Sequence, residues 1–252
     1  MMRIDSIYRY PVKGLTPEPL DFARLSSGRC IPWDRAFALA QGDCGFDSAS
    51  PAWRPKTEFL CLARNPAAWR LTTRFDDAAG LLAVTAGRGD AIEASPFTEA
   101  GREALTRFIA AALPDEMRGT PRFVHAEGHS FCDNKSQVIS LIGTASLRAL
   151  EAAAGAQRHP LRFRASLYLG GTAPWEEFGW IGKTLCIGAA RLRVSKRIVR
   201  CAATMVDPET GAVDANPVKE LMTNFGHTDC GVYAEVLDAG EIRPGDAIKI
   251  ME

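Results

Sequence analysis

A cysteine late in the chain lies in a stretch whose residue types suit chemistry. Cys201 follows the basic residues Lys196, Arg197 and Arg200, and it precedes the segment Asp-Pro-Glu-Thr-Gly at 207–211. Positive charge nearby favours the thiolate over the thiol, and a thiolate is both a nucleophile and a soft ligand for a transition metal. The alternative is a buried structural thiol, because free cysteine is among the most buried residue types.

The segments on either side of Cys201 predict a rigid position for it. Residues 191–194 (Arg-Leu-Arg-Val) alternate as a strand does. In 207–211 proline presets φ, aspartate can bond its own backbone and glycine accepts a positive φ, so this segment is expected to be a tight turn. We therefore expect Cys201 near the end of a β-hairpin arm, where ladder hydrogen bonds can position a ligand or nucleophile.

Two further turns have the composition of anion sites. Lys13-Gly14 follows a strand expected at 4–10, and a lysine beside a glycine turn offers three donors and a charge to a phosphate; an exposed turn lysine is the alternative. The strand expected at 138–142 turns through Gly143 and Thr144 into a helix. Such a turn can present backbone N–H groups to an anion, although Thr144 is also a good helix N-cap.

The spacing of His125 and His129 would suit a metal site on a helix. Gly128 and the lack of helical periodicity favour a loop instead, and the sequence offers no evident third ligand. We therefore assign no metal to this pair.

The amino-acid composition limits the classes of function that this protein can have. The 252 residues suggest one to two domains, with 46% hydrophobic and 24% charged residues, as in globular proteins. Because 30 basic residues balance 30 acidic ones, bulk nucleic-acid or polybasic membrane binding is not expected. The lack of a long apolar run or a signal sequence predicts a cytoplasmic protein. Seven cysteines without a Cys-x-x-Cys pair argue against a disulfide framework or a zinc ribbon.

Short strands separated by turn signals predict a mostly β (α+β) fold with few short helices. A helix is expected from Ser95-Pro96, and the polar stretch after it is the best boundary, giving domains 1–119 and 120–252. Period-two alternation predicts a single strand over 161–169. The other expected strands are 58–63, 69–74 and 81–85, with a hairpin turn at 76–80.

The motif Arg-Cys-x-x-Thr-x-Val-Asp-Pro-x-Thr-Gly at 200–211 resembles the signature of the MOSC family, in the branch of the mitochondrial amidoxime-reducing component and its bacterial relatives. The resemblance extends to Tyr-Pro-Val-Lys at 10–13, Asp34-Arg35, the turn at 143–147, Arg164 and the closing Pro-Gly-Asp strand. Ala165-Ser166 departs from the usual Pro-Asn. Relatives carry a basic residue near the end of the loop at 42–55, and Arg54 or Lys56 could fill that role; neither is assigned.

This resemblance implies a MOSC-type β-barrel domain at 120–252 packed with an N-terminal β-barrel-like domain at 1–119, and the molybdenum cofactor bound between them. It implies that Cys201 ligates molybdenum, that Cys201 and Asp207 are the catalytic residues, and that Asp207 orders the ligand loop or the substrate. The implied cofactor-binding residues are Lys13, Gly14, Arg35, Thr144, Arg164, Arg200 and Cys201.

The implied reaction is two-electron oxygen-atom chemistry on a small molecule, such as reduction of an N-hydroxylated or N-oxide compound. Some bacterial relatives append a ferredoxin-like domain with four cysteines, and its absence here implies a separate electron-donor protein. Two alternatives remain open: a non-catalytic carrier of the molybdenum cofactor, and a sulfur carrier that holds a persulfide on Cys201.

Overall fold

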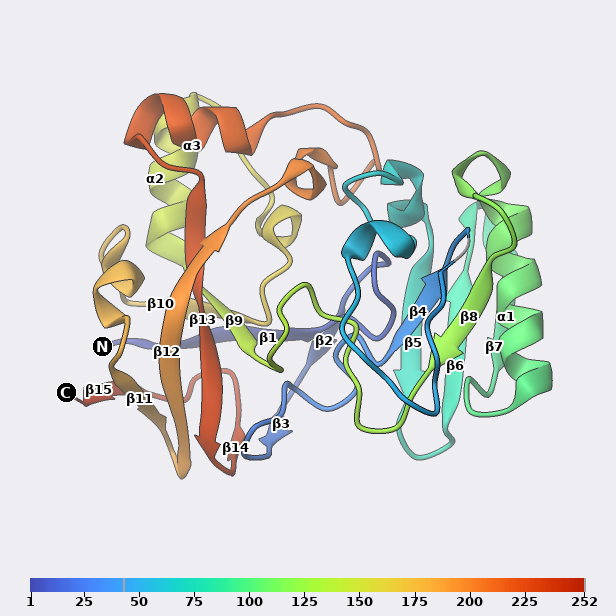
Figure 1. Cartoon of the computed structure of the whole chain (residues 1–252). Coiled ribbons are helices and arrows are strands. Elements are labelled where there is room, and N and C mark those ends of the chain that lie inside the picture. The colour runs from blue at the N-terminus through green and yellow to red at the C-terminus, as the bar shows by residue number, and fades with distance from the viewer. Residues whose placement is uncertain (43, 252) are drawn as a thin grey trace.

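The computed structural model describes residues 1–42 and 44–251, and in it strands outweigh helices, as the sequence predicts (Figure 1). The α-helices are α1 (Glu99–Ala112), α2 (Thr144–Ala154) and α3 (Pro217–Phe225). Short 3-10 helices are η1 (Lys56–Glu58), η2 (Pro66–Arg70), η3 (Gly87–Gly89), η4 (Pro114–Glu116), η5 (Pro160–Phe163), η6 (Glu176–Trp180) and η7 (Ala202–Met205). The strands are β1 (Arg3–Arg9), β2 (Glu18–Leu20), β3 (Ala23–Leu25), β4 (Phe37–Ala40), β5 (Thr72–Asp76), β6 (Leu81–Thr85), β7 (Ala91–Ala94), β8 (Arg122–His125), β9 (Ile139–Gly143), β10 (Leu167–Gly170), β11 (Thr184–Ile187), β12 (Ala190–Val199), β13 (Asp229–Asp238), β14 (Gly240–Ile242) and β15 (Ile248–Met251).

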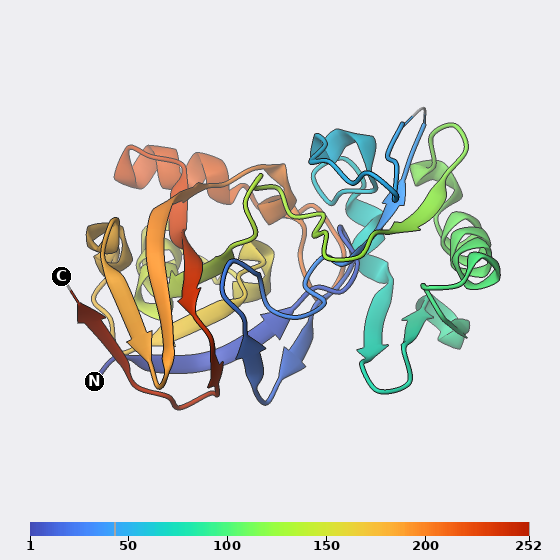
Figure 2. The same cartoon turned by 60° about the horizontal axis from the view of Figure 1, so that its bottom comes forward.

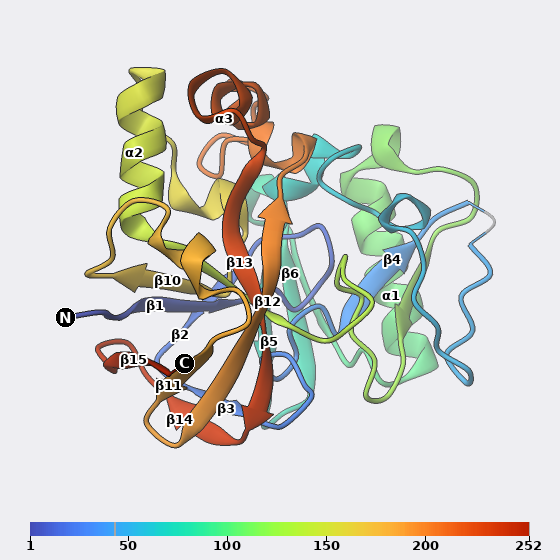
Figure 3. The ribbon, with the colours of Figure 1, turned by 60° about the vertical axis from the view of Figure 1, so that its left-hand side comes forward.

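One large sheet forms the part of the molecule that contains both termini (Figures 1 and 3). Its order is β15-β11-β12-β13-β9-β10-β1-β2, and its pairs are antiparallel except β9 with β10. Backbone bonds from Ile4 to Asp246 and from Ile248 to Met2 join β1 to β15, so the sheet curves into a barrel. Alternating residues of β12 point inward, and their aliphatic side chains fill the barrel core.

The second part holds the smaller sheets and α1, on the right of Figure 1. Strands β5, β6 and β7 form one sheet, β4 pairs with β8, and α1 packs against β7 and β8. Phe37, Leu39, Phe75, Leu105 and Ile109 belong to its core. The helix begins later than the sequence suggested, because Thr98 rather than Ser95 caps it by accepting a hydrogen bond from Gly101 N at 3.1 Å.

Strand pairing crosses the expected domain boundary at 119–120. The N-terminal strands β1 and β2 lie in the large sheet, and β3 pairs with β14, so residues 3–25 run along the barrel. Conversely β8, which follows the boundary, pairs with β4 of the other part. Figure 2 shows the two parts joined by these shared segments. The two-domain division stays a prediction, but the chain does not divide cleanly at one position.

Two strands expected from the sequence are wrong. Over 58–63 the chain contributes only an isolated bridge between Ala40 and Phe59, after the 3-10 turn η1. The strand expected over 161–169 is instead η5 followed by Arg164 in a left-handed conformation (φ 51°), and β10 starts only at Leu167. Pro160 favours this outcome, because proline suits the first position of a helical turn. The strand expected at 69–74 begins only at Thr72, because Trp69 belongs to the 3-10 helix η2.

None of the helices within 1–42 and 44–251 combines the length and the apolar character that crossing a membrane would require.

Candidate functional site

Cys201 lies just beyond the end of β12, at the start of η7. The backbone N–H of Arg200 still bonds to Thr228 O at 2.9 Å, which ties this residue to the segment leading into β13. The carbonyl of Cys201 then accepts hydrogen bonds from Thr204, from its backbone N and its Oγ1, both at 3.0 Å. The cysteine is thus fixed between a strand end and a one-turn helix, as the sequence predicted in outline.

Asp207 builds the turn after Cys201 rather than facing the pocket. Its Oδ1 accepts from Glu209 N at 2.9 Å and Thr210 N at 2.8 Å, and Gly211 adopts φ 71°. These bonds, led by those from Thr210 and Glu209, outweigh the effect of desolvation and hold the pKa of the Asp207 carboxyl below its ordinary value. The expected turn is confirmed, and Asp207 is not among the described residues that line the pocket.

Arg162 anchors this turn from the opposite side. Its side chain is 3% exposed; its guanidinium donates to Asp207 Oδ2 at 2.6 Å, Asp214 Oδ2 at 2.8 Å and Met205 O at 3.0 Å. From the other part of the molecule, Trp69 Nε1 donates to Pro208 O at 2.6 Å. The loop that carries Cys201 is therefore held by both parts of the chain.

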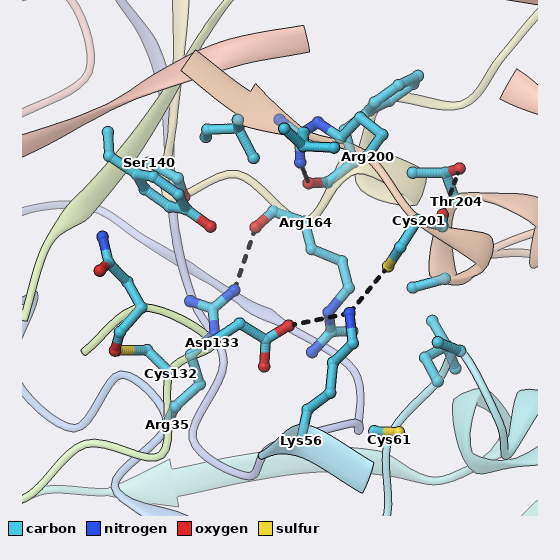
Figure 4. A pocket seen from close by; sticks show the side chains of 18 of the residues that line it. Arg35, Lys56, Cys61, Cys132, Asp133, Ser140, Arg164, Arg200, Cys201 and Thr204 are labelled. Carbon is cyan, nitrogen blue, oxygen red and sulfur yellow. Dashed lines mark hydrogen bonds and ion pairs between the residues drawn. The ribbon is translucent and has the colours of Figure 1, made fainter. Parts of the chain in front are cut away.

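A pocket of about 360 Å³ opens beside Cys201 between the two parts (Figure 4). Among the described residues its lining carries two acidic side chains, Asp34 and Asp133, and eight basic ones: Lys13, Arg35, Lys56, Arg162, Arg164, Lys196, Arg197 and Arg200. A neutral chain thus concentrates positive charge at one site, which favours an anionic ligand. Cys201 forms part of the same wall.

Successive contacts between charged side chains cross the pocket to the sulfur of Cys201. Lys13 Nζ is buried, bonded to Phe131 O at 2.7 Å and paired with Asp133 Oδ1. Lys56 Nζ lies 3.6 Å from Asp133 Oδ2 and 3.3 Å from Cys201 Sγ (Figure 4). Desolvation raises the pKa of Asp133, but Lys13 and then Lys56 outweigh it, so the pKa lies below its ordinary value. The carboxylate is therefore charged at neutral pH.

Arg35 and Arg164 meet over the ring of Tyr10. Their guanidinium carbons lie 4.4 Å and 4.3 Å from the ring centroid, within cation–π range. Arg35 is paired with Asp34 and donates to Arg164 O at 3.2 Å, while Arg164 donates to Leu15 O at 2.8 Å. Burial, with repulsion from Arg35, lowers the pKa of Arg164 to about 10, so both remain cations at neutral pH.

The other residues expected at the cofactor divide into those at the pocket and those away from it. Gly14 lies on the wall with φ 84°, where a Cβ would meet Leu60 O at 2.6 Å. Arg200 also lines the pocket, but it donates to Phe163 O at 2.7 Å and from Nε to Cys230 O at 2.8 Å, so it braces the backbone. Thr144 is outside the described lining, and its hydroxyl donates to Leu169 O at 3.1 Å.

The expectation that Thr144 caps α2 is wrong. Gly143 occupies the N-cap position, and Thr144 is the first residue of the helix. The start of α2 is instead bound by the buried carboxylate of Glu177, which accepts from Gly143 N at 3.3 Å and Ser146 Oγ at 2.8 Å. This turn is therefore already occupied by a carboxylate of the chain itself.

Sequence reasoning missed two residues that contact the others at the site. Asp133 stands in a short polar stretch, Asp-Asn-Lys, that matches no motif, and the sequence does not distinguish Lys56 from Arg54. The structure directs Arg54 to Gly45 O and Glu58, and Lys56 to Cys201. Lysine at 56 and aspartate at 133 are too far apart in sequence for spacing to link them, so only the resemblance gave a signal, and only for the lysine.

Two further cysteines, Cys61 and Cys132, also line the pocket. Burial raises the pKa of both thiols, so they stay protonated at neutral pH. Among the described residues no group of three or more His, Cys, Asp or Glu side chains could hold a metal ion. A metal in this pocket would depend on one sulfur and on further ligands brought with it.

Comparison with solved structures gives distant likenesses. The chain is similar to the YuaD protein from Bacillus subtilis, with a TM-score of 0.47 and 12% identity over 99% of this chain and 96% of that one. It is similar to YiiM from Geobacillus stearothermophilus, with a TM-score of 0.36 and 20% identity, and to YiiM from Escherichia coli, with 0.33 and 15%. Both YiiM matches cover 45% of this chain and 54% of the other. Comparison with curated proteins gave no significant match.

Two family models match the chain in succession. The MOSC N-terminal beta barrel domain matches residues 1–112, and the MOSC domain matches residues 126–249, which include the Cys201 turn. Between them they leave only the connecting segment and the last residues unmatched. The chain therefore belongs to the MOSC family, in the form that carries the MOSC N-terminal beta barrel domain.

Proposed function

We propose that this chain binds the molybdenum cofactor in the pocket beside Cys201 and acts as an oxidoreductase on small N-hydroxylated or N-oxide compounds. MOSC domains are associated with molybdenum-cofactor binding in general. The observation that carries the proposal is the placement of a cysteine sulfur on the wall of a pocket lined by eight basic side chains.

The residues present fit the group by their chemistry. A cysteine sulfur is a soft ligand suited to a transition metal, and ammonium and guanidinium groups form charge-assisted bonds with a phosphate. The pocket volume of about 360 Å³ falls within the range of small-molecule sites, which is roughly 300–1,000 Å³. Cys201 would hold the metal, and Lys13, Arg35 and Arg164 would neutralise the anionic end.

The cofactor, when bound, would supply the two-electron exchange that removes an oxygen atom from the substrate. The chain's own residues would position it: Arg162 and Asp207 fix the turn beyond Cys201, and Lys56 sets the charge around the sulfur. The electrons would come from a separate donor protein. Reduction of the N–O bond also consumes protons, which solvent can deliver through the open side of the pocket.

Metal and pterin content test the proposal. The full chain should be produced in a host that makes the cofactor, together with Cys201→Ala and Cys186→Ala. Cys186 is a matched control, because it lies on β11 outside the described lining of the pocket. We expect near-stoichiometric molybdenum and pterin in the wild type and in Cys186→Ala, and loss of molybdenum in Cys201→Ala.

Turnover then separates an enzyme from a carrier. The loaded protein should reduce a hydroxylamine or an amidoxime when an artificial reductant is supplied, and Cys201→Ala should not. Loading without turnover of either compound would instead support the carrier. Absence of both molybdenum and pterin, in a host shown to load another enzyme, would refute cofactor binding, and mass spectrometry of Cys201 for an added sulfur would then test the persulfide carrier.

A further inference from the structure

One carboxylate of the chain lies between two ammonium groups on the wall of the pocket. Lys13 Nζ donates to Asp133 Oδ1, and Lys56 Nζ lies 3.6 Å from Asp133 Oδ2. Figure 4 shows the carboxylate of Asp133 beside Lys56, which also reaches toward Cys201. We call Lys13 and Lys56 together the two-lysine subsite. In this structure the anion bound at the two-lysine subsite is a side chain of the protein itself, the carboxylate of Asp133.

The two acidic side chains of the pocket differ in how deeply they are buried and in how many contacts hold them. Asp34 is 2% exposed, accepts from Tyr10 N at 2.8 Å and pairs with Arg35, so it is part of the fold. The Asp133 side chain is 48% exposed and lies on the segment between β8 and β9, outside any helix or strand. Only the aspartate end of this pair meets water, because the Lys13 side chain is 7% exposed. An ammonium so buried needs an anionic partner, so Asp133 can leave only when another anion takes its place.

Lys13 would keep its place if Asp133 left. Its ammonium donates to Phe131 O at 2.7 Å, and its backbone N–H donates to Phe37 O at 2.8 Å. The side chain is also buried, so its position depends on the surrounding walls as well as on the carboxylate. A subsite that stays formed without its internal partner can accept another anion of similar or greater charge.

We propose that Asp133 is an intramolecular anion that occupies the two-lysine subsite and that the phosphate ester of a ligand binds there by displacing it. This rests on the proposed function only in using the same pocket. A phosphate monoester carries about −1.5 to −2 charges and three acceptor oxygens, so it balances two ammonium groups better than one carboxylate does. Asp133 then determines specificity, because weaker anions fail to compete with it.

Inorganic phosphate is a suitable probe, since it presents the same group without metal or pterin. Its affinity should be measured by isothermal titration calorimetry on the full chain, purified from a host that lacks the cofactor. Asp133→Asn should bind phosphate about tenfold more tightly than the wild type, because a competing charge has been removed from the site. Asp133→Glu keeps the charge and should stay within about twofold of the wild type.

Glu127→Gln is the matched control, because it removes the same charge from an exposed position on the same segment. It should leave phosphate affinity unchanged, which separates local competition from a change in net charge. Adding Lys56→Gln to Asp133→Asn should abolish the gain. Equal or weaker phosphate binding in Asp133→Asn would overturn the proposal, and so would phosphate binding too weak to measure in both proteins.

Failure of this inference is distinguishable from failure of the proposed function. Tighter phosphate binding in Asp133→Asn supports the displacement whether or not the wild type takes up molybdenum. Normal molybdenum loading with unchanged phosphate affinity in Asp133→Asn would leave the cofactor proposal standing and refute the displacement.

Discussion

The ammonium of Lys56 lies 3.3 Å from the sulfur of Cys201, although 145 positions separate the two residues. Lys56 begins η1 in the part formed by the first half of the chain, while Cys201 lies just beyond the end of β12 in the barrel. The environment of the sulfur is therefore made jointly by both parts. Its local charge should respond to changes in a segment that contributes nothing to the cysteine motif.

Lys56→Met should lower the reactivity of Cys201 toward an anionic alkylating reagent more than its reactivity toward a neutral one. The positive charge beside the sulfur attracts iodoacetate but not iodoacetamide, so the ratio of the two alkylation rates reports the local potential. We expect the ratio to fall about fivefold at low salt, equivalent to about 1 kcal/mol. Peptide mass spectrometry would follow Cys201 separately from the other cysteines.

Arg54→Met is the control for this measurement. It removes the same charge from the same segment, but Arg54 contacts Gly45 O and Glu58 instead of the sulfur. The rate ratio at Cys201 should therefore stay near that of the wild type. An equal fall in both variants would mean that the ratio reflects the overall charge of the pocket rather than the contact with Lys56.

Arg162→Met should destabilise the folded protein strongly. Arg162 is 3% exposed and pairs with Asp207 and Asp214, and removing one partner of a buried ion pair costs roughly 3–5 kcal/mol. Arg24→Met is the comparison, because the Arg24 side chain is 78% exposed in its pair with Glu241, and such pairs contribute about 0–1 kcal/mol. Urea unfolding would give both values, and similar losses would contradict the anchoring role of Arg162.

Local signals in the sequence predicted the elements that depend on neighbouring residues. The turn at 207–211 formed because Asp207 bonds the backbone two and three residues on. Asparagine at 216, proline at 217 and glycine at 226 are residue types that begin and end helices, and α3 has Asn216 as its N-cap, which bonds Lys219 N at 3.0 Å, and the left-handed Gly226 as its C-cap. Both features depend on hydrogen bonds within a few residues, so their signals lie in the local sequence.

Distant contacts decided the rest. The alternation over 161–169 is compatible with a strand, but Arg162 is drawn to Asp207 and Asp214, 45 and 52 positions away, and the chain bends through Arg164. Similarly, Asp133 and Lys56 become site residues only when the connecting segment of one part meets η1 of the other. Periodicity carries no information about such contacts, and the resemblance indicated a basic residue near the end of the loop at 42–55 without deciding between Arg54 and Lys56.

His125 and His129 should make stability depend on pH below neutrality. Burial lowers the pKa of both, and their rings lie 5.0 Å from Phe97 and 4.8 Å from Phe131. Because the unfolded chain takes up these protons first, stability should be full above about pH 6.5 and should fall as the pH drops through the lowered folded values. Replacing both by phenylalanine should flatten this dependence.

Urea midpoints at about pH 7.5 and about pH 5.5 would measure the effect in the wild type and in the double variant. The wild type should lose more stability between the two values than the variant does. If the losses are the same, protonation of other groups sets the pH dependence. If the double variant is more pH-dependent, the two imidazoles take up protons more readily in the folded chain than in the unfolded one, which contradicts the lowered pKa values.

Gly14→Ala should be far more damaging than Gly28→Ala, although both glycines have positive φ, 84° and 68°. At Gly28 nothing lies within 4 Å of an added Cβ, so only the backbone strain of about 1–2 kcal/mol applies. At Gly14 the Cβ would meet Leu60 O at 2.6 Å, a backbone atom that cannot rotate away, and we expect a total of about 2–5 kcal/mol. Thermal unfolding with urea titration would give both values.

The strain introduced by Gly14→Ala should also affect phosphate binding at the site. Moving Gly14 away from Leu60 displaces Lys13, whose ammonium is held by Phe131 O and Asp133. Gly14→Ala should therefore weaken phosphate binding at the two-lysine subsite even under conditions where the variant remains folded, whereas Gly28→Ala should bind phosphate as the wild type does. Equal phosphate affinity in a folded Gly14→Ala would show that the close approach to Leu60 serves the packing of the two parts alone and leaves the position of Lys13 unaffected.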